Sequence, residues 1–418
     1  MSDFNRWRAG NVKEALGVRR IVVISGARQT GKTTLAKQVA GATQSLFKPL
    51  DQQPYFDAAK SDPPSFVRNS SGTLVIDEIQ KVPALISEIK YAVDQDNRCG
   101  QYLLTGSANL QSLPTVTESL AGRVRTLRLR PLTQGEILRR KPVFLKRAFA
   151  GEFPARVRGC DKDALLELAF RGGYPEVVRM KNQRGRKAWH KDYMDALLQN
   201  DLRDIVRVAR RDALGDLAGI LAAWSGRFMD VAGLSRQTGI SRPTLASYIN
   251  ALEALYLFER VRPWVKTDYE RAGRACKMFA TDTGLMASIL DWKFDDVLND
   301  TATANTDRAG KMMETFVFQE LAAQVDLDDE YSLYHYRDRE KREIDFVVER
   351  ADGALLGIEV KAGRTVSKAD FAPQEWFKAN IAKNGKSYVG LVLYSGEATL
   401  SFGNGMHAVP TAALWTEG

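Results

Sequence analysis

The sequence predicts an α/β protein whose first part is a parallel sheet covered by helices on both faces. Between Arg20 and about Arg130, four apolar strands (IVVISG, TLVIDE, QYLLTGS and VRTLRLRPL) alternate with helical patterns. Strands that are apolar along their whole length are typical of parallel sheets buried between two helical layers. A compact helical stretch over 226–262 precedes a further helix from about Gly310 and a second group of strands that ends in GLVLYS. These observations predict more than one α/β domain.

Size and charge set the first limits. The chain has 418 residues, which suggests two to four domains, and it is 44% hydrophobic and 27% charged, as is ordinary for a soluble globular protein. The net charge is +9 and the pI is near 9.3, which favours a polyanionic partner, usually nucleic acid. A mildly basic surface without such a partner is the alternative.

Several classes of site and location are disfavoured by the sequence. The three cysteines are far apart and show no C-x-x-C spacing, which argues against a disulfide framework or a thiolate metal site: Cys99, Cys160 and Cys276. The three histidines are isolated from one another and from the cysteines, so a zinc site or a Ser-His-Asp triad has little material: His190, His335 and His407. No apolar run reaches 18 residues and the start has no apolar signal core, so no membrane span and a reducing cytoplasm are expected.

A short amphipathic helix is expected over 1–19, and the element after it carries a phosphate-binding motif. The stretch IVVISGARQTGKTTLAKQV reads as strand, glycine loop and helix, and its loop fits G-x-x-x-x-G-K-T in full. Gly26 and Gly31 let the backbone amides point inward, Lys32 reaches the outer phosphates, and Thr33 places its hydroxyl on Mg²⁺. The positive end of the following helix points at the phosphates. The motif predicts an ATP site formed by Gly26, Ala27, Arg28, Gln29, Thr30, Gly31, Lys32, Thr33 and Thr34.

The next strand, TLVIDEIQ, ends in two acids. An acid at the carboxyl end of a central strand lies across from the phosphate loop. Asp77 is therefore expected to hold Mg²⁺ through water, together with Thr33, and Glu78 is expected to polarise the attacking water. An acid pair that merely starts a helix is the alternative.

Two later stretches supply further candidates for this site. In QYLLTGSAN, a polar residue could meet the γ-phosphate or orient the water, although ordinary turn chemistry explains the pattern as well: Thr105, Ser107 or Asn109. In ESLAGRVRTLRL, Arg123 stands between a helix and a strand, where an arginine finger could reach a neighbouring site. Whether it acts on its own site or on a neighbour's stays open, and a plain surface arginine is the alternative.

Together GARQTGKT, LVIDEIQ, LLTGS, ESLAGR and RGGYPEV resemble the AAA-type and STAND-like P-loop ATPases of bacteria and archaea, over nearly the whole chain. The resemblance implies ATP and Mg²⁺ as ligands and often a ring or dimer, hence a homo-oligomer. It also implies that a G-x-P element contacts adenine, which corresponds to Gly173 and Pro175 here. In the set that this chain resembles, such an ATPase precedes an uncharacterised nuclease-like C-terminal domain.

The middle of the chain predicts a winged-helix unit. In MDVAGLSRQTGISRPTLASYINALEALYLFERV, apolar residues recur at helical spacing: Val231, Leu234, Ile240, Leu245, Ile249 and Leu252. Gly239 lies in the turn, Ser241 is expected to cap the second helix with Pro243 in its first turn, and YLFERV reads as a wing strand. The second helix would present three residues to DNA: Arg242, Thr244 and Ser247. A winged helix that packs on the nucleotide domain and binds no DNA is the alternative.

The C-terminal part carries charges in an apolar hairpin. REIDFVVERADGALLGIEVKAG predicts strands over Ile344–Glu349 and Leu355–Val360, with a turn at Asp352-Gly353. Because side chains alternate along a strand, Glu359 and Lys361 share a face, and Asp345 can face them from the neighbouring strand. Upstream, KMMETFVFQEL reads as a helix with Glu314 on its apolar side, pointing toward the sheet.

These charges make sense if a hard cation binds among them. Mg²⁺ prefers carboxylates and waters, and it would polarise a phosphodiester while Lys361 orients the attacking water. The constellation resembles the PD-(D/E)xK nuclease fold, which implies metal ligation and cleavage by Asp345, Glu359 and Lys361 and metal ligation by Glu314, although Ile344 replaces the usual proline. A solvent-facing salt bridge, or an inert fold kept for binding, is the alternative.

The predicted organisation is an ATPase core over 1–132, a helical lid over 133–208, a winged helix over 209–265 and a restriction-endonuclease-like α/β domain over 266–418. The predicted function is a Mg²⁺-dependent ATPase that acts on DNA and controls a nuclease-like C-terminal domain. Two rivals remain: a DNA-binding ATPase motor with an inert nuclease fold, and a STAND-like switch that binds a protein partner.

Overall fold

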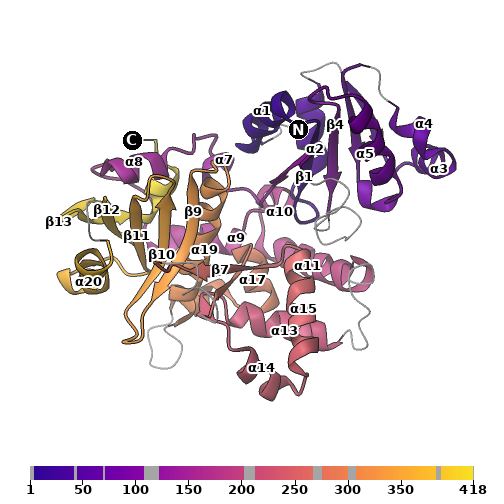
Figure 1. Cartoon of the computed structure of the whole chain (residues 1–418). Helices are drawn as coiled ribbons and strands as arrows, with labels where there is room; N and C mark the ends of the chain where they lie inside the picture. The colour runs from indigo at the N-terminus through magenta and orange to yellow at the C-terminus, as the bar shows by residue number, and fades with distance from the viewer. Residues whose placement is uncertain are drawn as a thin grey trace. The chain divides into compact units, whose positions relative to one another are not determined.

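The computed structural model describes residues 4–41, 45–68, 71–107, 122–201, 212–266, 275–299, 307–382 and 387–417. The chain divides into two compact units (Figure 1). Unit 1 consists of Met1–Leu132, Tyr174–Glu176 and Ala251–Leu257, and unit 2 consists of Thr133–Gly173, Val177–Asn250 and Phe258–Gly418. Within the described ranges, no helix combines the length and the apolar character needed to cross a membrane.

Unit 1 contains a five-stranded sheet in the order β2-β3-β4-β1-β5. Its strands are β1 (Ile21–Ser25), β2 (Ser45–Pro49), β3 (Thr73–Asp77), β4 (Tyr102–Gly106) and β5 (Val124–Arg128). Every neighbouring pair is parallel, which confirms the predicted parallel sheet. The carboxyl ends of all five strands therefore lie at one edge, where ligands of such sheets bind.

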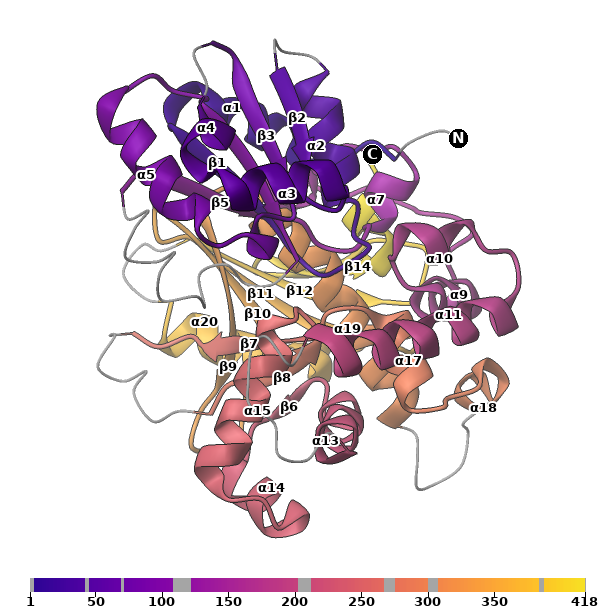
Figure 2. The ribbon, with the colours of Figure 1, turned by 90° about the vertical axis from the view of Figure 1, so that its right-hand side faces the viewer.

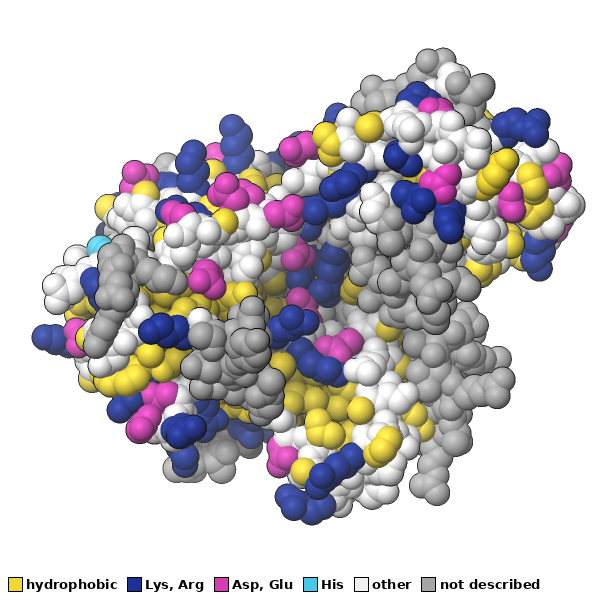
Figure 3. Space-filling model, in the orientation of Figure 1, with side chains coloured by type: hydrophobic (Ala, Val, Ile, Leu, Met, Phe, Trp, Pro, Cys, Tyr) yellow, Lys and Arg dark blue, Asp and Glu magenta, His cyan; other side chains and the backbone are white. Residues whose placement is uncertain are grey.

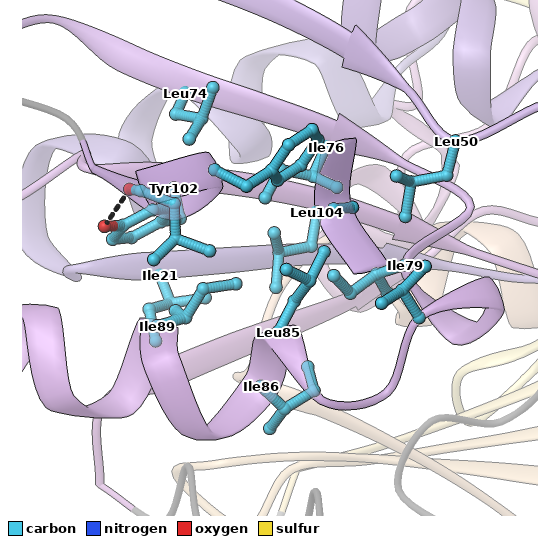
Figure 4. Packing of buried hydrophobic residues seen from close by; sticks show 14 of the residues in the cluster. Ile21, Leu50, Leu74, Ile76, Ile79, Leu85, Ile86, Ile89, Tyr102 and Leu104 are labelled. Carbon is cyan, nitrogen blue, oxygen red and sulfur yellow. Dashed lines mark hydrogen bonds between the residues drawn. The ribbon is translucent and has the colours of Figure 1, made fainter. Parts of the chain in front are cut away.

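Helices cover both faces of this sheet. They are α1 (Arg8–Val18), α2 (Lys32–Ala40), α3 (Gln53–Ser61), α4 (Pro63–Val67) and α5 (Leu85–Gln95), with a 3₁₀ turn η1 (Ile79–Lys81). Alternate residues of β1 enter two different cores: Ile21 and Val23 pack on the side of α5, and Val22 and Ile24 on the side of α1 and α2. Figure 4 shows the first core, in which Leu85 and Ile89 of α5 lie against strand residues such as Ile21.

Unit 2 begins with helices. They are α7 (Gln134–Ile137), α8 (Phe144–Ala150), α9 (Lys162–Arg171), α10 (Pro175–Arg179, which starts in unit 1), α11 (Gln183–Ala196), a π-helical turn η3 (Leu197–Asp201) and α13 (Asp212–Ala223). The first of them starts at a capping box, because the Thr133 hydroxyl accepts from the Glu136 amide and the Glu136 carboxylate accepts from the Thr133 amide.

The predicted helix-turn-helix is present as secondary structure. After β6 (Arg227–Phe228) come α14 (Val231–Thr238), Gly239 with a φ of 67°, and α15 (Arg242–Ala254). The Ser241 hydroxyl accepts a hydrogen bond from the Thr244 amide at 3.4 Å, as predicted for a cap. The next strand, β7 (Phe258–Pro263), differs from the prediction, because it pairs with β8 and β9 of the C-terminal sheet instead of forming a separate wing.

The large sheet of unit 2 has nine strands in the order β13-β14-β12-β11-β10-β9-β7-β8-β6. Besides β6 and β7 these are β8 (Lys277–Ala280), β9 (Tyr331–Arg337), β10 (Glu343–Arg350), β11 (Leu355–Lys361), β12 (Tyr388–Tyr394), β13 (Leu400–Gly403) and β14 (Met406–Pro410). The predicted hairpin is confirmed, since β10 and β11 pair antiparallel and Gly353 in their turn has a φ of 83°. The sheet joins strands on both sides of residue 265, where the sequence predicted a domain boundary.

Helices flank this sheet as well: α17 (Thr283–Ile289), α18 (Phe294–Leu298), α19 (Asp307–Val325) and α20 (Ala372–Asn380), with 3₁₀ turns η4 (Lys368–Phe371) and η5 (Thr411–Trp415). Helix α19 packs on β8, β9 and β11, whereas α20 packs on β10 and β12, and the two lie on opposite sides of the strands (Figures 1 and 2). Phe377 of α20 belongs to a core with Ile344 and Val347 of β10.

Candidate functional site

The loop between β1 and α2 has the backbone conformation that its glycines were expected to allow. Gly26 has a φ of 147° and Gly31 a φ of 94°, and Gln29 between them also lies in the left-handed region at 63°. A Cβ atom on Gly26 would stand 2.3 Å from the carbonyl oxygen of Leu129, so no larger residue fits without moving the backbone. The loop therefore adopts a curled path that depends on glycine at position 26.

Lys32 is folded back over this loop. Its side chain is buried, and its Nζ donates to the carbonyl oxygens of Gly26 at 3.0 Å and Ala27 at 2.8 Å. The Thr30 hydroxyl donates to the same Ala27 carbonyl at 2.9 Å. The ammonium thus lies against two carbonyls of the loop at the amino end of α2, the end of a helix at which anions bind.

Arg6 fixes the loop from outside the motif, which the sequence analysis missed. Its guanidinium donates to the carbonyl of Thr30 at 2.7 Å and to that of Arg130 at 2.6 Å, and the residue is buried. It ties the loop to the chain that follows β5. No local pattern marks Arg6, because its partners lie 24 and 124 residues away in the sequence.

Asp77 lies beside Thr33, as the sequence predicts. The Thr33 hydroxyl approaches both carboxylate oxygens of Asp77, at 2.9 and 3.0 Å, and the Thr105 hydroxyl donates to Oδ1 at 2.5 Å. Burial raises the pKa of Asp77, while the hydrogen bonds from Thr105 and Thr33 act in the opposite direction. Strand β4 lies between β3 and β1, and this position lets Thr105 reach the carboxylate.

Glu78 follows in a left-handed conformation, with a φ of 60°. Its amide donates to the Thr105 hydroxyl at 3.0 Å, and its carboxylate accepts from Gln80, whose amide also donates to the Ser107 hydroxyl at 2.9 Å. Of the three polar candidates at the end of β4, Thr105 contacts the Asp77 carboxylate and the Glu78 amide, and Ser107 reaches the Glu78 carboxylate through Gln80. Asn109 lies outside the described residues. Gln80 was not anticipated, although it stands two residues beyond the acid pair in LVIDEIQ.

This set of groups fits a nucleotide with a divalent cation. The curled loop and the first turn of α2 offer backbone amides and the Lys32 ammonium to phosphates, and Thr33 with Asp77 offers oxygen ligands of the kind Mg²⁺ prefers. Three of the predicted loop residues are exposed around the cradle: Arg28, Gln29 and Thr34.

Arg123 lies at the amino ends of the strands, opposite the end that carries the phosphate loop. It precedes β5, and its carbonyl accepts from the amide of Ile21 at the amino end of β1. Its guanidinium pairs with Asp94 through two hydrogen bonds, at 2.5 and 3.0 Å. Five strand residues span about 16 Å, so Arg123 does not contact the phosphate loop of its own chain. Action on a neighbour's site stays a prediction.

The two residues matched to adenine contact have other surroundings in the structure. The Gly173 amide donates to the Asp282 carboxylate at 2.7 Å within unit 2. Burial raises the pKa of Asp282 to about 6, and the amides of Leu285 and Gly173 oppose this shift. Pro175 opens α10 in a segment, Tyr174–Glu176, that belongs to unit 1. The adenine role of both residues stays a prediction.

In unit 2, the predicted C-terminal acids meet around a buried lysine. The Lys277 Nζ lies 2.6 Å from Glu343 Oε1, 2.9 Å from Glu314 Oε1 and 3.1 Å from Asp345 Oδ1. The Lys277 side chain is 1% exposed. The other Asp345 oxygen accepts from the Val360 amide at 3.0 Å. The structure thus brings Glu314 and Asp345 together, as predicted, but the cation between them is an ammonium group.

Glu359 and Lys361 lie in different surroundings, because burial acts on the Glu359 carboxyl whereas the Lys361 side chain is partly exposed. Burial and the nearby Asp345 charge raise the pKa of Glu359 well above its usual value, whereas Lys277 and Lys361 act to lower it. The Lys361 ammonium pairs with Asp370 at 3.2 Å, and its side chain is 40% exposed. Within the described ranges, no group of three or more Asp, Glu, His or Cys is arranged to hold a metal ion. The metal role of Glu314, Asp345 and Glu359 stays a prediction.

The sequence analysis missed Lys277 and Glu343. The sequence does contain a signal for Glu343: it stands two residues before Asp345, and alternation along a strand places both side chains on one side. No local pattern marks Lys277, since it stands in the short strand KMFA, 37 residues before Glu314 and 68 residues before Asp345.

The three residues proposed for DNA contact are exposed on α15: Arg242, Thr244 and Ser247. On the face drawn in Figure 3, Lys and Arg side chains are interspersed with Asp and Glu. This face therefore offers scattered positive charge, and the helix itself supplies one arginine to the proposed contact.

Comparison with known proteins divides the chain into three matched stretches. Residues 18–138 match the model of an AAA domain. Residues 162–296 and 309–414 match two domains of unknown function, DUF8612 and DUF4143. The AAA match covers the sheet, the glycine loop and the acid pair described above, and it supports an AAA-type P-loop ATPase.

Relatives extend over almost the whole chain. Uncharacterized proteins of Mycobacterium tuberculosis and Mycobacterium bovis are each 27% identical over 413 residues, which cover 98% of this chain and 84% of the relative. Among solved structures, a Walker-type ATPase of Pyrococcus abyssi is 14% identical, with a TM-score of 0.45, and the alignment covers 69% of this chain and 96% of that one.

Proposed function

We propose that the chain is a Mg²⁺-dependent ATPase that acts on DNA. The observation that carries the ATPase part is the hydrogen-bonded set of Thr33, Asp77 and Thr105 beside the Lys32 loop. It stands at the carboxyl edge of a parallel sheet whose sequence matches an AAA domain. An aspartate and a hydroxyl that converge next to a phosphate cradle are the groups expected to hold Mg²⁺ in such a site.

Each group has a defined task in this proposal. The loop amides and Lys32 would bind and orient the phosphates, and Mg²⁺, when bound, would supply positive charge to them. Thr33 and Asp77 would hold that ion. Glu78 stands next to Asp77, where its carboxylate would take part in orienting a water, and Thr105 fixes the relative position of the two acids.

The decisive experiment is ATP turnover with and without several forms of DNA. Lys32→Ala is expected to abolish turnover, because it removes the charge that faces the outer phosphates. Lys37→Ala, an exposed position on the same helix, is the matched control and is expected to leave turnover unchanged. Full activity of Lys32→Ala would refute the phosphate site.

The DNA part is supported by the net charge of +9 and by the exposed residues of α15. Binding of labelled duplex and branched DNA should weaken as salt rises. Arg242→Ala should weaken it further and lower the magnitude of the log–log salt slope by about one, as expected for one lost phosphate contact. Arg156→Ala, an exposed arginine paired with Glu397, serves as the control. ATP turnover without any gel shift would favour a switch that binds a protein partner.

For the C-terminal domain, two candidates compete. The hairpin and its carboxylates support a nuclease-like domain, whereas Lys277 among those carboxylates favours a DNA-binding ATPase whose C-terminal domain is inert. Plasmid and branched DNA should be incubated with Mg²⁺ or Mn²⁺ and with wild type, Asp345→Ala and Lys361→Ala. Cleavage that both substitutions abolish would establish the nuclease. Equal silence of all three proteins supports the inert domain.

We also propose that the chain works as a homo-oligomer in which Arg123 reaches a neighbour's nucleotide. Arg123→Ala should then lower turnover, and mixing it with Lys32→Ala should restore part of the activity. Restoration is expected because the mixed assembly contains an intact Lys32 site that faces an intact Arg123. Absence of any restoration would refute action across subunits.

A further inference from the structure

We propose that Lys277 is a built-in cation of the C-terminal domain, which takes the place of a divalent metal ion in its carboxylate cluster. The carboxylate cluster here means Glu314, Glu343 and Asp345. As the chain stands, this cluster would take no divalent ion, and loss of the lysine would convert it into a divalent-cation site. The inference concerns unit 2 alone and does not rest on the ATPase proposal.

The geometry matches the number of donors to the number of acceptors. An ammonium group has three N–H donors, and Nζ has three carboxylate oxygens within 2.6 to 3.1 Å, one from each acid. The side chain is almost fully buried. A charge that deep in a protein persists only when it is paired, and here each of its donors has an ionisable partner.

The fold builds the cluster around the lysine. Pairing of β10 with β9 is irregular between Ile344 and Val347, and such bulges re-aim side chains. Ile344 and Val347 belong to the core with α20, whereas Asp345 shares Lys277 with Glu314 of α19. Gly226 leaves the space that Glu314 needs, because a Cβ atom there would lie 2.7 Å from Oε2. The Phe228 ring adds a face 5.6 Å from Nζ.

A divalent ion would compete for the position that Nζ holds. Mg²⁺ needs oxygens at about 2.0–2.1 Å and Ca²⁺ at about 2.3–2.6 Å, on the same carboxylates that now accept from the ammonium. It would also have to enter beside a positive charge that the chain itself holds in place. Removal of the side chain beyond Cβ leaves three carboxylates that face one vacated space, and oxygen-rich anionic sites are those that hard cations occupy.

The test measures Mn²⁺ binding and thermal unfolding of full-length, nucleotide-free protein. All variants carry Lys32→Ala, which separates the measurement from the phosphate site. The Lys277→Ala variant is expected to unfold at a lower temperature than its parent and to recover several degrees when millimolar Mn²⁺ is added. Its Mn²⁺ affinity should exceed that of the parent at least tenfold. Adding Asp345→Asn to it should remove most of this gain, because one ligand is lost.

Two controls make the result specific. Lys311→Ala removes another lysine of unit 2, whose Nζ bonds to a backbone carbonyl, and it should gain no Mn²⁺ affinity. Lys277→Gln keeps a hydrogen-bond donor of similar length and provides a folded variant if Lys277→Ala does not fold. It should be less stable than the parent and gain less from Mn²⁺ than Lys277→Ala.

If no Lys277 variant folds, Mn²⁺ binding by the parent protein still tests the inference. Mn²⁺ binding by the parent that Asp345→Asn abolishes would overturn the inference, because the cluster would then hold lysine and metal together. A folded Lys277→Ala variant that gains neither affinity nor stability from Mn²⁺ would overturn it as well. No Asp345-dependent Mn²⁺ binding in the parent supports it.

Discussion

At the scale of single residues, Thr105 links the two acids of the proposed ATP site. Its hydroxyl donates to Asp77 and accepts from the Glu78 amide. Thr105→Val removes both bonds, and a buried polar group left without its partner costs about 1–3 kcal/mol. We expect kcat for ATP to fall about tenfold, the cost of roughly 1.4 kcal/mol in the barrier, with nucleotide affinity nearly unchanged. Steady-state kinetics and nucleotide titration would measure the two effects.

Thr73→Val is the matched control for this substitution. The Thr73 hydroxyl is also buried and donates to the Gly100 carbonyl at 2.7 Å, but it stands at the amino end of β3. It should lower stability by about 1 kcal/mol and leave kcat unchanged. An equal loss of kcat in both variants would mean that Thr105 acts through stability alone.

Glu320 of α19 predicts a pH dependence of folding. It is buried and accepts from the Gln134 amide at 2.9 Å. Burial raises its pKa to about 8; the Gln134 amide and Arg171 oppose this shift, and Glu136 adds to it. Because the folded-state pKa exceeds the usual value of 4.5, the stability that the protonated form contributes is present at acid pH and is lost as pH rises toward 8.

Glu320→Gln should remove this dependence. The free energy of unfolding of the variant, minus that of wild type, should increase with pH between about 5 and 8, by at most roughly 1.4 kcal/mol per pH unit. Urea unfolding at several pH values measures the difference. A difference that does not change with pH would show that the carboxyl titrates alike in the folded and unfolded chains.

At the scale of elements, the turn between β10 and β11 depends on one glycine. Gly353 has a φ of 83°, a region that disfavours side chains. Gly353→Ala should lower the stability of unit 2 by about 1 kcal/mol. Gly363→Ala, just past β11, should leave stability unchanged or raise it slightly, because its φ is not left-handed and nothing lies within 4 Å of the added Cβ. Denaturant unfolding measures the stability of both variants. An equal loss of stability in the two would contradict the role of the left-handed conformation at Gly353.

Elements marked by local patterns could be predicted from the sequence. Apolar runs predicted four of the five strands of the first sheet but not β2, whose sequence SLFKP is not a continuous apolar run. Glycine motifs predicted the phosphate loop and the hairpin turn. The partners of a short strand could not be predicted in this way. The alternation in YLFERV is the same for a wing and for a strand of a larger sheet, so pairing of β7 with β8 and β9 left no local signal.

The residues of the candidate sites also differ in whether a local sequence pattern marks them. Lys32, Thr33 and Asp77 are specified by motifs whose spacing reflects one strand-loop-helix geometry, and the structure brings them together. Arg6, Gln80 and Lys277 act through contacts across the fold. Lys277 could not be predicted, because a sequence can indicate which acids converge but not which positive charge lies between them.

At the scale of the whole molecule, each unit has its own core. The clusters on the two faces of the first sheet lie within unit 1, and the cluster around Phe377 lies within unit 2. We therefore expect two transitions in calorimetric unfolding. Mg²⁺ with ATP at about 100 times the dissociation constant should stabilise unit 1 by about 2.7 kcal/mol and shift one transition.

The hairpin variant identifies the other transition. Gly353→Ala should lower the second transition and leave the nucleotide-dependent one in place. In the Lys32→Ala variant, ATP should shift no transition. A single transition that responds equally to nucleotide and to Gly353→Ala would contradict the division and show that the chain unfolds as one cooperative body.

The nine-stranded sheet has a practical consequence for anyone who dissects the protein. A fragment that stops at residue 265 retains β6 and β7 but loses β8 and β9, with which they pair. The complementary fragment loses the strands that border β8 and β9. Each piece would expose unsatisfied backbone along a severed edge, which is a template for self-association. Truncations should therefore respect the pairing of strands, and insoluble fragments cut at that point would say nothing about whether the intact molecule folds.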